Sequence, residues 1–138
     1  MSGRTATARW QPGPLRCDVE IDGFDLPVDE PVADGGTGQA PGPTGMLLTS
    51  VASCFTLSLA FTAGRQGLAP SAIRVTVTGR YDGLRFGRIE VVSDVDGLTV
   101  DEVADLIVRA QRVCYVTNTL ARPPEIVFST PGQPATAG

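Results

Sequence analysis

The chain of 138 residues contains no histidine and no lysine. Histidine is the usual general base near neutral pH and the commonest metal ligand, so its absence removes the residue that most often carries either chemistry. All eleven basic residues are arginine, so a positive charge that assists a reacting group has to come from a guanidinium. If the protein performs chemistry, its three cysteines are the first candidates to carry it.

Charge and cysteine content limit the partners and the compartment. A formal net charge of −4 argues against nucleic acid, because the phosphate backbone attracts basic surfaces. Three cysteines, an odd number, follow an N-terminus (MSGR) without an apolar leader, which is not typical of a secreted disulfide framework. We therefore expect a cytoplasmic protein without a nucleic-acid partner.

Turn signals divide the N-terminal part of the chain. Gln11-Pro12-Gly13-Pro14 separates the candidate strands 5–10 and 15–21, and Asp22-Gly23 marks a second turn, so a β-meander is expected. Residues 29–45 are rich in glycine and proline and have no apolar periodicity, which predicts a loop. A loop of this length often serves a function or shields a site.

A long uncharged segment, residues 44–64, follows this loop and predicts a helix. Its length is sufficient to cross a bilayer. However, hydroxyl side chains are spread along it, and a helix that is apolar on most of its circumference is also typical of the centre of a domain. We expect a core helix and no membrane.

The rest of the chain predicts a hairpin, a second helix and a last strand. Alternation over 73–78, the turn Asp82-Gly83 and the apolar residues of 88–95 indicate two antiparallel strands. Thr99 and Glu102 form a capping-box pattern ahead of a helix that Pro123-Pro124 ends. A short strand is expected at 125–129. The sequence thus predicts one α+β domain over residues 1–130, with antiparallel sheet packed around two core helices, and a disordered tail at 131–138.

Cys54 and Cys114 each lie in one of the two predicted helices. Helices that share a core can bring two thiols together as a reversible dithiol/disulfide couple. The alternative is that both are inert core thiols, which is the commonest role of a buried cysteine. Cys17 alternates with charged residues in a predicted strand and is expected to be structural. A metal site is not expected, since the chain has no histidine and no Cys-x-x-Cys pair.

Several segments, taken in order, resemble the OsmC/Ohr family of hydroperoxide-reducing proteins. The resemblance covers roughly residues 5–129, and the two cysteines stand 114 − 54 = 60 residues apart, as the reactive pair of that family does. The matching segments are Asp29-Glu30-Pro31, Gly35-Gly36, Pro41-Gly42-Pro43, Leu47-Leu48, Ala52-Ser53-Cys54 and Arg112-Val113-Cys114-Tyr115-Val116.

The resemblance implies an intertwined homodimer that reduces organic hydroperoxides with a dithiol reductant and without a cofactor. Cys54 would attack the peroxide and Cys114 would resolve the sulfenic acid as a disulfide. It also implies an assisting arginine, for which Arg16 is nearest in spacing and Arg9 is a second candidate. The family's glutamate, ten residues before the first cysteine, is replaced by Thr44, and Asp29 or Glu30 are candidates to supply the carboxylate. The alternative is an OsmC-fold protein without peroxidase turnover that binds a small apolar ligand at the dimer interface.

Overall fold

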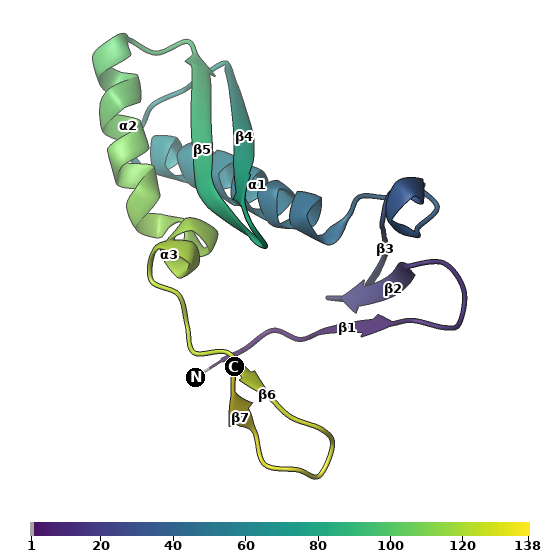
Figure 1. Ribbon diagram of the computed structural model, residues 1–138. Coiled ribbons are helices and arrows are strands. Elements are labelled where there is room, and N and C mark those ends of the chain that lie inside the picture. Colours follow the sequence, from purple (N-terminus) through teal and green to yellow (C-terminus); the bar gives the residue numbers. More distant parts are fainter. Residues whose placement is uncertain (1) are drawn as a thin grey trace. The chain divides into compact units, whose positions relative to one another are not determined.

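The computed structural model describes residues 2–138 as two compact units, the first ending at Thr49 and the second spanning Ser50–Gly138. We expected one domain over residues 1–130. The boundary falls inside helix α1 (Pro43–Arg65), so the helix expected at 44–64 is present and belongs to both units. The mixture of helices with antiparallel sheets is the predicted α+β class (Figure 1).

The first unit contains the predicted meander. Strands β1 (Ala6–Arg9), β2 (Arg16–Ile21) and β3 (Phe24–Asp29) form an antiparallel sheet in the order β1-β2-β3. Asp22 and Gly23 both have positive φ, at 52° and 82°, which suits the tight turn between β2 and β3. The loop after β3 contains one turn of 3-10 helix, η1 (Val32–Asp34), and leads into α1.

The second unit is built on a long hairpin and the helices packed against it. Strands β4 (Ala72–Asp82) and β5 (Arg85–Asp96) pair along their whole length, with one irregularity at Arg80/Tyr81. Helix α2 (Val100–Val113) begins with the predicted capping box, in which Thr99 and Glu102 bond reciprocally. Figure 1 shows α2 beside this hairpin.

The core of the second unit is shared by α1, α2 and β5. Leu59 and Leu106 are completely buried, and the remaining buried members of this cluster are Phe55, Ala63, Val95, Ala110 and Cys114. α1 is also long and apolar enough to meet the length and hydropathy criteria for a membrane span, with a mean hydropathy of 1.7. Core helices meet the same criteria, and Phe55, Leu59 and Ala63 of α1 pack in this cluster as expected of a core helix.

The helix expected between Thr99 and Pro123 is interrupted, which corrects the prediction that Cys114 lies within it. α2 ends at Val113, Cys114 adopts φ −84° and ψ 102°, and α3 (Tyr115–Ala121) follows. β-branched and aromatic residues of low helix propensity surround the break and account for it: Val113, Tyr115, Val116 and Thr117.

The C-terminal end of the chain forms a small hairpin. β6 (Val127–Phe128) lies within the segment expected to be a strand and pairs with β7 (Thr136–Ala137). β7 falls in residues 131–138, which we expected to be a disordered tail. The sequence offered little signal for β7, because its two residues show no apolar alternation.

Candidate thiol site

Two of the three cysteines lie in contact in the second unit. The Sγ atoms of Cys54 and Cys114 are 3.4 Å apart, and both residues are free thiols. Cys114 is completely buried and Cys54 is half-buried. The structure thus brings together the two residues expected to form a redox couple, and it leaves one of the two residues, Cys54, partly exposed.

The two thiols are held by different local structures. Cys54 lies in the middle of α1, where the Ser58 hydroxyl donates to the Cys54 carbonyl at 2.8 Å. Cys114 lies at the break between α2 and α3, where the hydroxyl of Thr117 approaches the Cys114 carbonyl at 3.4 Å. The backbone is extended at Cys114, and the residue is buried at the junction of the two helices.

The surroundings of Cys114 favour its thiolate. Burial acts most strongly and raises the pKa of the Cys114 thiol, but hydrogen bonding with Thr117, Cys54 and Ser58 outweighs burial, and the net pKa lies below the ordinary value. Thr117 contributes through both its side chain and its backbone N–H. A low pKa makes Cys114 a good leaving group when a disulfide between the two cysteines is reduced.

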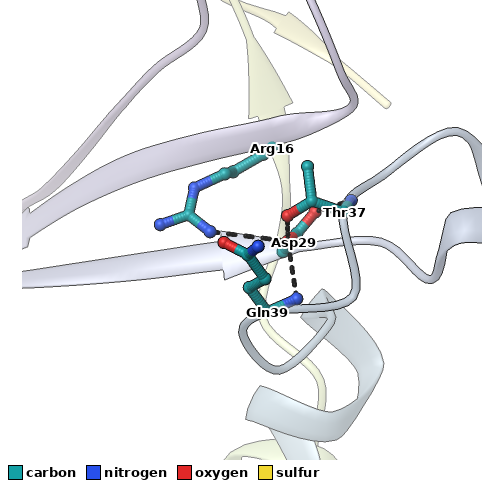
Figure 2. Close-up of polar contacts among 4 residues, drawn as sticks. All are labelled: Arg16, Asp29, Thr37 and Gln39. Atoms are coloured by element: carbon teal, nitrogen blue, oxygen red, sulfur yellow. Dashed lines mark hydrogen bonds and ion pairs between the residues drawn. The ribbon is translucent and has the colours of Figure 1, made fainter.

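The first unit contains a second polar cluster, which includes Arg16. Arg16 begins β2 and stands directly opposite Asp29, the last residue of β3. The Arg16 guanidinium lies 3.5 Å from the Asp29 carboxylate, and Figure 2 shows this pair together with Thr37 and Gln39. The Asp29 side chain is fully buried, whereas that of Arg16 is 34% exposed.

The loop after β3 surrounds the Asp29 carboxylate with donors. Oδ1 accepts from the Thr37 backbone N–H at 2.9 Å, and Oδ2 accepts from the Gln39 backbone N–H at 3.0 Å and from the Thr37 hydroxyl. The Thr37 hydroxyl is the largest cause of the lowered pKa of Asp29, about 2; burial opposes it, and the two backbone bonds and the Arg16 charge add to it. Asp29 is therefore a fixed anion at neutral pH.

Gly36 allows the loop to pass this closely. A Cβ atom at Gly36 would overlap the Glu30 carbonyl oxygen and lie 2.5 Å from Asp29 Oδ1. The sequence predicts Asp29 as a candidate carboxylate but does not indicate Thr37 and Gln39 as its partners. The available signal was the Gly35-Gly36 pair shortly after Asp29, since paired glycines indicate a backbone that approaches another group closely.

The remaining candidates from the sequence lie in the same unit. Arg9 ends β1 and, like Arg16, lines a cavity of about 330 Å³. Cys17 is half-buried in β2 opposite Val28. Thr44 lies in the first turn of α1 and has no carboxylate. Within residues 2–138 no group of three or more cysteine, aspartate or glutamate side chains is arranged to hold a metal ion.

Comparison with known proteins identifies the family. Residues 36–129 match the family described as OsmC-like protein, which is more than half of the chain. The chain belongs to the OsmC-like protein family. The resemblance found in the sequence is therefore confirmed. A comparison with curated proteins finds no match.

Solved structures of the OsmC-like family share the fold. The OsmC-like protein from Mycoplasma pneumoniae is 20% identical with a TM-score of 0.76, covering 87% of this chain and 88% of that one. The organic hydroperoxide resistance protein OsmC from Legionella pneumophila is 22% identical with a TM-score of 0.67, covering 87% and 90%. An organic hydroperoxide resistance protein from Elizabethkingia anophelis is 24% identical with a TM-score of 0.67, covering 86% of this chain and 89% of that one. At these identities the likeness establishes the OsmC-like fold, and the roles of Cys54, Cys114 and Arg16 stay predictions.

Proposed function

We propose that this OsmC-like protein reduces organic hydroperoxides through Cys54 and Cys114, with Arg16 assisting. The observation that carries the proposal is the 3.4 Å separation of the two Sγ atoms. A disulfide requires about 2.05 Å between sulfur atoms, so the two sulfur atoms have to approach each other by little more than about 1 Å to join. Two inert core thiols have no need to meet in this way. The names of the Legionella and Elizabethkingia structures support the same activity.

The chemistry follows from the accessibility of the two thiols. The Cys54 thiolate, on the half-buried residue, attacks the terminal peroxide oxygen; the O–O bond breaks, Cys54 becomes a sulfenic acid, and the alkoxide leaves and takes a proton from water to become the alcohol. Cys114 then attacks the Cys54 sulfur, the S–O bond breaks, and water leaves. One thiol of a dithiol reductant attacks the disulfide at Cys54, and Cys114 departs as the thiolate that its hydrogen bonds stabilise. The second thiol of the reductant then breaks the mixed disulfide at Cys54, so that Cys54 is released as a thiolate and the reductant leaves as a disulfide. Each cycle reduces one peroxide and oxidises one dithiol.

The proposed active assembly is an intertwined homodimer in a reducing compartment, the cytoplasm. Large apolar side chains that a lone chain leaves exposed support dimerisation, among them Leu57 at 68% and Phe61 at 60% exposure on α1. A reducing compartment keeps the resting cysteines as free thiols, ready to react with peroxide.

The direct test is peroxide consumption by the purified protein with cumene hydroperoxide and a dithiol. We expect peroxide loss to match dithiol oxidation and free thiols to fall when the dithiol is omitted. Cys54→Ser should abolish turnover, whereas Cys17→Ser serves as the matched cysteine control and should retain it. Turnover that survives Cys54→Ser would contradict the proposal.

The second candidate function is binding of a small apolar ligand at the dimer interface without turnover. Thr44 favours it, because the carboxylate expected at this position is absent. In the first unit, a cavity of about 250 Å³ is lined by Trp10, Leu15, Val28 and Pro43 together with Arg16 and Asp29. Quenching of Trp10, the single tryptophan, by a medium-chain alcohol in a protein that consumes no peroxide would support this alternative.

A further inference from the structure

We propose that Asp29 is the positioning residue for Arg16: it holds one side of the guanidinium and leaves the remaining donors available to a reacting group. The inference rests on the proposed function, in which Arg16 assists Cys54. The carboxylate that anchors the Arg16 guanidinium then lies at the end of β3 instead of in the first turn of α1.

The first support is the fixed geometry of the pair. Arg16 and Asp29 are partners in the β2–β3 register, so the sheet itself sets their separation. The Arg16 Nη1 to Asp29 Oδ2 distance is 3.5 Å. Within residues 2–138, Asp29 is the acid that forms an ion pair with Arg16. Because a cross-strand pair is defined by backbone pairing, the contact does not depend on flexible side chains alone.

The second support is the rigidity of the anion. Three donors from Thr37 and Gln39 hold both carboxylate oxygens of a side chain with no exposed surface. The loop is also tied to the sheet, since Asp29 N–H donates to the Pro41 carbonyl at 3.0 Å and Glu30 N–H donates to the Leu15 carbonyl at 3.1 Å. A carboxylate held in this way can orient a guanidinium without moving with it.

The third support is what the contact leaves available on Arg16. A guanidinium has five N–H donors, and one nitrogen faces Asp29. The Arg16 side chain is 34% exposed and lines the cavities of about 250 and 330 Å³. The guanidinium is thus held on one side and presented to open space on the other, which is the arrangement required to bind an oxygen of a ligand or to stabilise a thiolate.

The competing explanation is that Asp29 only fastens the loop. The two explanations differ in a double-variant comparison of Arg16→Ala and Asp29→Asn. If Asp29 acts through Arg16, the effects do not multiply, and the double variant is no slower than Arg16→Ala alone. If Asp29 fastens the loop independently, the two losses multiply.

The experiment measures two rates for each variant, cumene hydroperoxide reduction and alkylation of Cys54 followed by mass spectrometry across pH. We expect Asp29→Asn to lower kcat/KM by about tenfold, as loss of one charge-assisted contact does, and to slow the alkylation of Cys54. Asp25→Asn, an exposed β3 carboxylate, is the matched control and should change neither rate. The far-UV circular dichroism of each variant verifies that it is folded.

Two further variants keep the test decisive. Thr37→Val removes a loop bond but keeps the carboxylate, so it should slow the reaction less than Asp29→Asn does. Position 44 follows Pro43, which lines the same cavity as Arg16. A carboxylate introduced there by Thr44→Glu in the Asp29→Asn background should therefore restore part of the lost rate. If the losses in the alkylation rate caused by Arg16→Ala and by Asp29→Asn multiply in the double variant, the inference is overturned. If no variant or wild-type protein consumes peroxide, the proposed function fails, and the alkylation comparison still decides whether Asp29 acts through Arg16.

Discussion

Cys54 and Cys114, 60 residues apart in the chain, lie with their Sγ atoms 3.4 Å from each other. The contact joins the middle of α1 to the break between α2 and α3. Since the same helices form the core of the second unit, the approach of the two sulfur atoms is fixed by packing. A cycle between dithiol and disulfide therefore needs no unfolding of that core.

The first prediction concerns the resolving role of Cys114. In Cys114→Ser, no thiol lies beside Cys54, so one equivalent of organic hydroperoxide should leave Cys54 as a sulfenic acid or over-oxidised form instead of a disulfide. Intact mass and labelling with a sulfenic-acid reagent measure this directly. The Cys17→Ser protein should form the intramolecular disulfide as the wild type does. An unmodified Cys54 in Cys114→Ser would contradict the assignment.

The second prediction concerns the hydrogen bonds to Cys114. Burial raises the pKa of this thiol, while Thr117 is the first of the groups that lower it. Thr117→Val removes the hydroxyl donor and should raise the Cys114 pKa, so that the ultraviolet absorbance of the Cys114 thiolate appears at higher pH in a protein that also carries Cys17→Ser and Cys54→Ser. Thr117→Ser keeps the hydroxyl and should behave as the wild type. Equal profiles for the valine and serine variants would show that the hydroxyl has no such role.

The sequence predicted those features that depend on local patterns. Asp22-Gly23 indicated the β2–β3 turn, and Thr99 with Glu102 indicated the start of α2, because turn and cap preferences act within a few residues. The meeting of Cys54 with Cys114 was expected only in outline, from two helices sharing a core.

Other features depend on contacts that are not visible in local sequence. The break at Cys114 was missed because an apolar stripe continues through it, although the residues around it favour strand. The sequence does not predict the burial of Asp29, because Thr37 and Gln39 bind its carboxylate through their backbone N–H groups. Nearly every residue type has such a group, so the residue type does not indicate the contact. The pairing of β7 with β6 likewise depends on tertiary placement rather than on propensity.

The third prediction concerns acid stability of the first unit. The pKa of Asp29 is lowered from 3.8 to about 2. The ionised Asp29 carboxylate therefore stabilises the folded unit fully when the pH is above its pKa in the unfolded chain, 3.8. This contribution to the free energy of unfolding is lost as the pH falls through the pKa of the folded state, about 2. Urea unfolding followed by Trp10 fluorescence should show a lower midpoint at about pH 2.5 than at about pH 5. Asp29→Asn should reduce this pH dependence, and Asp25→Asn should leave it unchanged.

The last prediction concerns the exposed apolar stripe of α1. Leu57 and Phe61 are one helical turn apart and are 68% and 60% exposed in the chain, and the Arg65 guanidinium lies 6.0 Å from the Phe61 ring centroid. Burying such a side chain contributes about 1.5–3 kcal/mol, so a partner subunit that covers the stripe stabilises the pair. We expect the wild type to have twice the chain mass of 14.4 kDa in light scattering. Phe61→Glu should weaken dimerisation by at least about tenfold, since it loses this burial and places a charge in the interface. Val108→Glu on α2, a residue that is also exposed, at 51%, is the matched control and should remain dimeric. A wild type that is monomeric at micromolar concentration would contradict the expected homodimer.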